Sequence, residues 1–547
     1  MKFKFLTLAV IAMLFTACKP QSESGSENSG TNNNDGEKSY ISISLASSDG
    51  EKRGDGDNDG GYEEGETNER AVKTAYAFFF TDGQPFTNIN STTNYQQISL
   101  TMVDETHLDN ISDVSGNVLV INAHEGQLPN QLMVVLNWVP TKTTYSIEEL
   151  RKSICVSHIN TGLEQDKEYF VMSNSVYQSV AGDVYATPLN ITDFYTSSET
   201  AMSNPVSVYV ERVAAKVRVK TPGDTDAGAN ATTTKFQLKN NEGAPLTING
   251  ETIYAEILGW DLYKDYEYST LLKDIEGIGN DLGITWNDAN NFRSYWAKCN
   301  SEYENNDVID YDDDLLAVNN HFYCGENTRG NSEANAADRT KIFFKAQLQK
   351  EDGSFVEYAK WLGNEYIGKS TLLTAVKNTL AYTYYSGVTD TEGNTTYTSI
   401  EAGDLMTVAG TGNVNEPAAY EVYFQINNEV NKIWYKLENN EFKTISKDAL
   451  NTALKAIEPA ILYSNGYTYY YTDIQHLKSA TATTYGIVRN HIYEVRINSI
   501  SGLGTPVGDE TSNIVVPETP SEEDIKTYLA AEINILSWKL ITNDIDL

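Results

Sequence analysis

This sequence is poor in the residue patterns on which catalysis usually depends. Its six histidines are scattered, without the H-E-x-x-H or H-x-H spacing of a metal site, and no G-x-S-x-G nucleophile turn occurs. The 76 acidic residues include runs such as DYDDD at 310–314, which are typical of solvated loops rather than of a catalytic carboxylate pair. The sequence therefore predicts a protein that is not an enzyme and that needs no cofactor.

Positive charge and long apolar runs are also scarce. Lysine and arginine number 40 against 76 acidic residues, and the net charge of −36 repels phosphate backbones, so we expect no nucleic-acid partner. Beyond the N-terminus no apolar run approaches the ~20 residues of a membrane span. The 35 tyrosines, with frequent Thr, Asn and Val, favour strands joined by polar turns.

The N-terminus has the pattern of an export signal. Lys2 and Lys4 precede the apolar stretch FLTLAVIAMLF, which is too short to span a membrane. The stretch ends in LFTAC, which resembles a lipobox and predicts a signal peptide over residues 1–17 and acylation of Cys18. The alternative is an ordinary signal peptide with a chance cysteine. In the first case the membrane anchor is a lipid.

Three further cysteines are too few and odd in number for a disulfide framework. Cys299 and Cys324 either pair with each other in an oxidising compartment or remain free core thiols. Cys155 is predicted to end a helix, SIEELRKSIC, which Ser146 and Glu149 open as a capping box.

Short strand patterns recur along the rest of the chain and predict an all-β fold. After a polar tether, YISISLA alternates apolar and polar residues, with Ile41, Ile43 and Leu45 on one face. Similar patterns follow, with a few short helices between them. The polar break at 221–234 divides the chain into two predicted β-sandwiches.

The stretch KRGDGDNDGGYEEGE, residues 52–66, combines three motifs: an RGD tripeptide, a basic protease site and the spacing of a calcium loop. The calcium spacing also fits a simple solvated acidic loop, and we favour that loop. The RGD tripeptide alone is a weak signal for integrin binding. The stretch GNEYIGKST, residues 363–371, has P-loop spacing, but the strand pattern before it alternates like an antiparallel strand, so we expect no nucleotide site. The candidate calcium ligands are Asp55, Asp57, Asp59 and Glu66.

The last segment, AEINILSWKLITNDIDL, is apolar and follows the acidic, proline-containing linker VPETPSEED. Its apolar residues fall in two phases, which indicates a bulge or contacts on both faces. A strand of this kind needs a sheet edge to dock on. Its apolar residues are Ile533, Ile535, Leu536, Trp538 and Leu540.

Several segments, taken in order, resemble the shaft fimbrillins of short (minor) fimbriae, which are lipoprotein-derived type V pili. The resemblance begins with the lipobox at Cys18 and with KSYISISLA, which a basic residue and GDG follow. It continues with VYVERVAAKVRV and ADRTKIFFKAQL. It ends with VRNHIYEVRINSISGLG and EINILSWKL, which are the most specific.

This resemblance implies two transthyretin-like, Greek-key sandwiches and assembly by donor-strand exchange. A trypsin-like protease would cut after Arg53, or alternatively after Arg70, and so remove the first strand with its Ile41, Ile43 and Leu45. The C-terminal strand of a neighbouring copy would then fill the vacated groove, which makes the chain its own partner. The implied divisions are 1–17 signal peptide, 18–53 tether and removable strand, 54–221 N-terminal domain, 222–520 C-terminal domain and 521–547 donor strand.

The resemblance also implies fimbrial anchor and tip proteins as partners, and a precursor that the outer membrane holds by its lipid before the fimbrium forms outside the cell. Two other functions stay open: a fimbrial anchor or accessory protein that keeps its lipid, and a surface glycan-binding lipoprotein. The glycan-binding hypothesis predicts exposed tryptophans in a groove. The fimbrial hypothesis predicts that most of the seven tryptophans lie in the core or at an interface.

Overall fold

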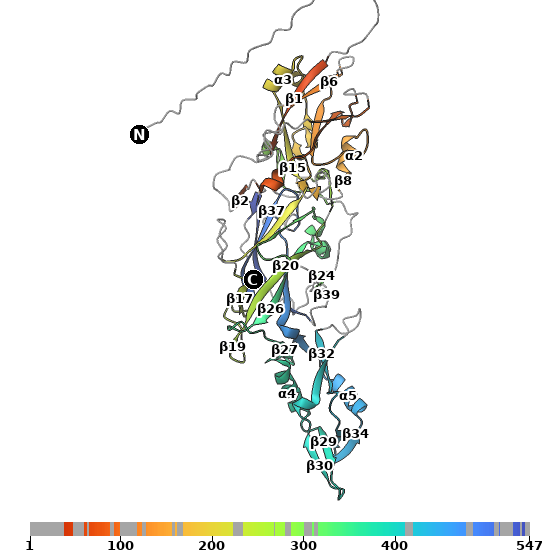
Figure 1. The fold of residues 1–547 in the computed structure, drawn as a ribbon, viewed down its shortest axis with the longest axis vertical. Helices are drawn as coiled ribbons and strands as arrows, with labels where there is room; N and C mark the ends of the chain where they lie inside the picture. Colours follow the sequence, from red (N-terminus) through yellow and green to blue (C-terminus); the bar gives the residue numbers. More distant parts are fainter. Residues whose placement is uncertain are drawn as a thin grey trace, which may run out of the picture.

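A computed structural model shows an elongated, mostly β-structured molecule with three successive units (Figure 1). The predicted all-β fold is confirmed. The residues that it describes are 38–47, 59–62, 65–87, 92–98, 117–122, 127–155, 159–160, 168–222, 233–266, 268–278, 286–299, 309–310, 315–410, 420–476, 485–507, 513–514, 529–536 and 539–541.

The N-terminal unit is built on one sheet, which lies at the end of the molecule that carries the labels β1, β6 and α3 in Figure 1. Short strands β5 (Tyr95–Gln97) and β14 (Thr187–Pro188) pair with β3 and β7. The strand order is β4 (Gln84–Pro85), β3 (Ala75–Thr81), β7 (Gln131–Leu136), β11 (Met172–Asn174), β15 (Val206–Arg212), β1 (Lys38–Ser47) and β6 (Asn117–Asn122).

Both faces of this sheet are covered, which explains the continuous apolar run in β3. Phe79 packs into the cluster that contains Ile41, whereas Phe78 and Phe80 pack into a second cluster on the other face. The second cluster includes Trp296 from the middle of the chain, so the N-terminal unit shares its core with the next unit. Helix α2 (Ile147–Arg151) covers this face, and α3 (Ser198–Ser203) lies beside β1.

The second unit holds a second long sheet around the fully buried Trp260. The indole nitrogen of Trp260 donates a hydrogen bond of 3.0 Å to the carbonyl of Ala317, so this large side chain leaves no polar atom unpaired. The strand order is β25 (His321–Cys324), β16 (Ala215–Lys220), β37 (Ile492–Ser501), β17 (Lys235–Lys239), β20 (Tyr254–Tyr263), β26 (Lys341–Gln349), β36 (Tyr467–Asp473) and β38 (Thr505–Pro506).

The chain changes sheets earlier than the sequence predicts. Strand β15 belongs to the first sheet and β16 to the second, so the change occurs at Val213–Ala214 rather than at the polar break of 221–234. The break was misleading because VYVERVAAKVRVK is one apolar stretch that two adjacent strands share. Both Val213 and Ala214 are buried, and no turn signal marks the change.

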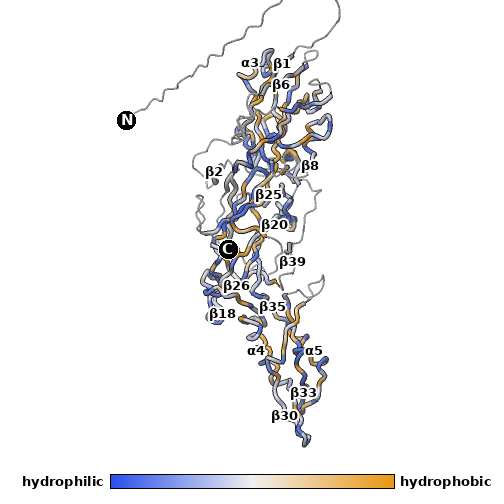
Figure 2. Tube along the Cα trace, in the orientation of Figure 1, coloured by the Kyte–Doolittle hydropathy of each residue, from blue (hydrophilic) through white to orange (hydrophobic). Residues whose placement is uncertain are grey.

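A further unit, residues 356–463, is inserted between β26 and β36 and forms the far end of the molecule (Figure 1). In Figure 2 apolar stretches run through the middle of the molecule, whereas the turn that leads into β30, at the tip of the molecule, is hydrophilic. One sheet has the order β28 (Asn364–Ile367), β27 (Tyr358–Trp361), β35 (Ala460–Tyr463), β32 (Glu421–Ile426), β31 (Leu405–Ala409); the other has β30 (Thr395–Ser399), β29 (Tyr384–Thr389), β33 (Ile433–Glu438), β34 (Glu441–Ile445).

The third unit contains short helices and the stretch with P-loop spacing. Asn439 and Asn440 form the turn between β33 and β34, and α4 (Lys369–Leu380) and α5 (Lys447–Lys455) are two of the few short helices that the sequence predicts between strands. The P-loop-like stretch is antiparallel strand β28 leading into α4, which is not the parallel strand and loop of a nucleotide site.

The predicted helix around Cys155 is wrong at its end. The capping box of Ser146 and Glu149 is present, but the helix stops at Arg151, and Ile154–Cys155 forms a short strand that pairs with Ser269–Thr270. Tertiary pairing with the second unit overrides the local helical pattern here. Within the described ranges no helix is both long and apolar enough to cross a membrane.

Replacing Trp260 should test the core of the second unit. Trp260→Ala should lower the free energy of unfolding by about 3–5 kcal/mol, because it removes a buried indole and its hydrogen bond. Tyr382→Ala is the control, since this side chain is 84% exposed and its loss should cost less than about 0.5 kcal/mol. Equal losses for both variants, in denaturant titrations, would contradict the placement of Trp260.

Candidate functional site

Strand β1 sits inside the first sheet rather than at its edge. Residues Ile43–Ser47 pair in parallel with Val206–Val210 of β15, and residues Lys38–Ile43 pair antiparallel with Asn117–Asn122 of β6. Within the described part of the chain, β6 has no strand partner other than β1. The first strand of the chain therefore completes the sheet on both of its sides.

Two isoleucines of β1 are embedded in the N-terminal core. Ile41 is 0% exposed and Ile43 2%, and they belong to the same cluster as Leu119 of β6 and Val208 of β15. Burying such side chains contributes roughly 1.5–3 kcal/mol each. The predicted alternation of this strand is confirmed for these two residues. Leu45 lies in β1, and only its backbone is described.

The C-terminal segment is docked on its own chain by backbone pairing. Strand β40 (Leu529–Leu536) runs antiparallel to β37, with Ile492 opposite Leu536 and Ile500 opposite Leu529. Strand β41 (Lys539–Ile541) runs antiparallel to β2 (Asp59–Tyr62). Ile533, Ile535 and Leu536 thus lie in β40 and Leu540 in β41, whereas Trp538 falls outside the described residues.

A short segment after β2 is fastened where the two sheets meet. In helix α1 (Thr67–Arg70) the carboxylate of Glu69 is 0% exposed and accepts a hydrogen bond of 2.7 Å from Lys216 Nζ in β16. Tyr323 of β25 also donates its hydroxyl proton to this carboxylate. The guanidinium of Arg212, at the end of β15, donates to the backbone carbonyl of Glu69 at 2.7 Å.

The charges around Glu69 compensate one another. Burial raises the pKa of the Glu69 carboxyl, but the charge and hydrogen bond of Lys216 outweigh burial and hold that pKa below its ordinary value. Lys216 also pairs with Glu66 at 2.9 Å. A buried ion pair is stable only when its remaining hydrogen-bonding positions are filled, as they are at Glu69.

Asn137 holds the next stretch of this segment. Its side-chain amide donates to the carbonyl of Ala71 at 2.8 Å and to that of Phe170 at 2.8 Å, and its oxygen accepts from the backbone N–H of Lys73 at 2.7 Å. The chain from Glu66 to Lys73 is therefore bonded to β15, β16 and β25 and to Asn137, which directly follows β7. We call residues Glu66–Lys73 the anchor segment.

Two further buried ion pairs are present, one within the second unit and one that joins the two units. Arg489 pairs with Glu326 at 2.5 Å and donates to the carbonyls of Thr270 and Leu271. Lys273 pairs with Glu211 at 2.8 Å, and both side chains are fully buried. These contacts lie in the VRNHIYEV and VYVERVAA segments, which explains why charged residues stand in otherwise apolar stretches.

The other predicted site residues are separated from these contacts or lie outside the described ranges. Cys18, Arg53, Asp55 and Asp57 fall outside them, and Asp59 lies in β2. Arg70, the alternative cleavage residue, lies in α1 next to Glu69. Among the described residues no three His, Cys, Asp or Glu side chains are grouped to hold a metal ion.

The disulfide alternative is wrong, because Cys299 and Cys324 remain thiols. The Cys324 side chain faces the core of the second unit, whereas the Cys299 sulfur donates to the carbonyl of Glu326 at 3.2 Å. Burial raises the pKa of the Cys299 thiol to about 12, so it stays protonated at neutral pH.

The tryptophans lie where the fimbrial hypothesis expects them. Trp138 is half-buried, and Trp538 is outside the described residues. Five of the seven are buried, with exposures of 4% or less: Trp260, Trp286, Trp296, Trp361 and Trp434. This burial counts against exposed tryptophan platforms for a glycan.

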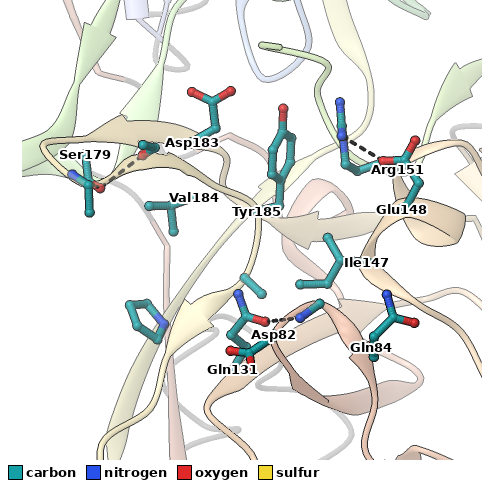
Figure 3. Close-up of a pocket in the computed structure, with 15 residues that line it drawn as sticks. Asp82, Gln84, Gln131, Ile147, Glu148, Arg151, Ser179, Asp183, Val184 and Tyr185 are labelled. Carbon is teal, nitrogen blue, oxygen red and sulfur yellow. Dashed lines mark hydrogen bonds and ion pairs between the residues drawn. The ribbon is translucent and has the colours of Figure 1, made fainter.

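A cavity of about 490 Å³ opens beside α2 in the N-terminal unit (Figure 3). The guanidinium of Arg151 lies 4.2 Å from the centre of the Tyr185 ring and pairs with Glu148 at 2.8 Å and with Glu276 at 2.9 Å. Burial raises the pKa of Tyr185 to about 12, so the phenol is neutral at pH 7. These contacts tie α2 to the loop of the second unit, and we assign them to folding.

Glu69→Gln should test the anchor segment. At pH 7 the variant should lose about 3 kcal/mol of stability, because Lys216 stays buried with one charged partner fewer. The pKa of Glu69 is lower in the folded than in the unfolded chain, so its contribution is complete above about pH 4.5 and is lost as the pH falls below that value. Denaturant titrations should therefore show a difference from wild type that shrinks towards acid.

Glu441→Gln on the exposed face of β34 is the matched control and should change stability by less than about 0.5 kcal/mol. A loss for Glu69→Gln that is the same at pH 7 and pH 3 would contradict the ionised state of this carboxylate.

Residues 461–544, which include β36, β37 and the docked C-terminal strands, match the family model described as "Major fimbrial subunit protein type IV, Fimbrillin, C-terminal". No curated protein matches the sequence.

Three solved structures show a distant likeness. A fimbrillin (fimA) from Porphyromonas gingivalis W83 is 13% identical, with a TM-score of 0.35 over 93% of this chain and 98% of that one. The tip fimbrial protein Mfa3 from Porphyromonas gingivalis is 9% identical (TM-score 0.26, 84% and 95%). A fimbrial assembly protein from Parabacteroides distasonis is 11% identical (TM-score 0.25, 75% and 100%). TM-scores this low do not establish a shared fold, and the resemblance to the fimbrillins is shown for residues 461–544.

Proposed function

We propose that this chain is a structural subunit of a cell-surface fimbria that is exported as a lipoprotein, activated by proteolysis and polymerised by donor-strand exchange. One observation carries the proposal: β1, the strand next to the predicted cleavage site, completes the first sheet from its interior. Removing it would open a groove between β15 and β6 that only another strand can fill.

The C-terminal segment has the properties of the strand that fills this groove. It is already β-structured, and it is held on its own chain through strand pairing at a sheet edge. An edge strand can leave without opening the core of its own unit. Donation from one copy to the next is head-to-tail and does not close, so it produces a filament.

The anchor segment supports Arg53 over Arg70 as the cleavage residue. A protease needs an accessible, extended stretch of chain, whereas Arg70 ends a helix whose Glu69 is fully buried and bonded to three strands. Cutting after Arg53 would leave these contacts on the mature subunit, and cutting after Arg70 would sever them.

The remaining parts of the proposal follow from the same mechanism. The partners are further copies of this chain, fimbrial anchor and tip proteins, and the processing protease. The precursor is held in the outer membrane by a lipid on Cys18, and the cleaved subunit becomes part of an extracellular fimbrium that supports adhesion. The protein acts as a structural component and not as an enzyme.

Controlled cleavage tests this function. Brief trypsin treatment of the purified chain should remove a fragment that ends at Arg53, and a ladder of polymers should then appear on gels loaded without boiling. The double variant Lys52→Ala with Arg53→Ala should stay monomeric, because trypsin cuts after lysine as well as arginine, whereas Arg70→Ala should polymerise like the wild type. Removing residues 529–547 should abolish the ladder and leave the cut unchanged.

Monomers after complete cleavage at Arg53 would overturn donor-strand exchange. Polymers formed by the chain without residues 529–547 would exclude this segment as the donor.

A substitution in β1 should affect only the uncut protein. Ile43→Ala should lower the stability of the precursor by about 2–5 kcal/mol, because the side chain is buried in the N-terminal core. After cleavage at Arg53 this residue is gone, so polymers of variant and wild type should melt at the same temperature. Leu119→Ala in β6 is the control and should destabilise both forms.

A further inference from the structure

Strand β2 has an unusual position, because it lies on the chain between the removable strand and the anchor segment. β1 ends at Ser47 and β2 begins at Asp59, so the predicted cut at Arg53 falls within the eleven residues between them. On its other side, β2 ends at Tyr62, only four residues before Glu66. In the uncut chain β2 is therefore fixed at both ends. On one side the chain leads to β1, which is paired with β15 and β6, and on the other side it leads to Glu69 with its hydrogen bonds.

β2 is also the partner of the last described strand of the chain. Asp59 lies opposite Ile541, Gly60 opposite Leu540 and Tyr62 opposite Lys539, with a bulge between Gly60 and Tyr62. The C-terminal tail is thus held at two places: β40 lies on β37, and β41 lies on β2.

We propose that β2 is a clasp that keeps the C-terminal tail on its own subunit for as long as the chain to β1 is intact. The inference rests on the proposed function and adds a regulatory link to it. The cut that allows β1 to leave its position between β15 and β6 also places β2 next to a free chain terminus, so that β2 is fixed at one end only. The same event would therefore open the acceptor groove and loosen the donor strand.

The composition of β2 suits such a conditional clasp. Its sequence, DGGY, contains two glycines, which lose the most conformational entropy when a strand forms and offer no side chain to pack. A two-stranded pair of this length has little stability of its own. Fixing both ends of β2 reduces the entropy that pairing must overcome, and chain termini without such fixation fray.

Hydrogen exchange can measure the clasp directly. We would use the chain with Cys18→Ser, which removes the lipid attachment, and with the recognition sequence of a site-specific protease in place of residues 50–56. Amides of residues 539–541 and 59–62 should exchange at least ~10-fold more slowly before the cut than after it, at a dilution at which no polymer has formed. Gly60→Val with Gly61→Val should strengthen β2 and reduce this change, because valine favours strands.

A disulfide provides the matched test of function. Gly60→Cys with Leu540→Cys places two thiols at opposite positions of the pair, and oxidation should hold the tail in place. The oxidised, cut variant should polymerise at least ~10-fold more slowly than the same variant after reduction. Gly60→Cys alone is the control and should polymerise equally with and without reductant.

The outcomes separate the clasp from the function on which it rests. If the cut wild type forms no polymer, donor-strand exchange is wrong. If polymers form but residues 539–541 exchange at the same rate before and after the cut, the clasp alone is wrong. Failure of the double variant, Gly60→Cys with Leu540→Cys, to form the disulfide in the uncut chain would also overturn the clasp, because it would contradict the pairing of β2 with β41.

Discussion

The position of β1 between β15 and β6 is the constraint on which the rest of this structure depends. A strand inside a sheet satisfies two rows of backbone groups, whereas an edge strand satisfies one. Ile41 and Ile43 of β1 also fill two apolar sites in the N-terminal core, which would be empty without this strand. The N-terminal unit is therefore complete only with a strand in this position, whether that strand comes from the same chain or from another.

The anchor segment determines where the firmly bonded part of the chain begins. Glu69 bonds to Lys216 and Tyr323 of the second sheet, while Arg212 at the end of the first sheet holds its backbone. These contacts fix the chain at the meeting point of the two sheets. The shared core around Trp296 and the buried ion pair of Lys273 with Glu211 of β15 also join the two units. The chain from Glu66 onward is thus tied into the folded body, and along the chain β1 is attached to that body through β2 alone.

Much of the architecture was predictable from local pattern, and what was missed depended on distant contacts. The alternation in YISISLA predicted β1, and the capping box predicted the start of α2. The buried pair of Glu69 and Lys216 was not predicted, because the two residues lie 147 positions apart and each looks like an ordinary surface charge. The end of α2 at Arg151 was missed for the same reason, since Ser269 supplies the competing strand pairing of Cys155.

For the proposed donor-strand exchange, the pairing geometry also supplies a physical reason why the tail would leave its own chain for the site of β1. A tail docked on its own chain acts at roughly millimolar effective concentration. A neighbour at micromolar concentration is then at a disadvantage of about 4 kcal/mol. On its own chain β40 is paired along one side, with β37, whereas the seat of β1 offers β15 and β6 together. A second row of about five ladder bonds at ~0.5–1.5 kcal/mol each, with burial of apolar side chains in the sites of Ile41 and Ile43, is enough to offset that disadvantage.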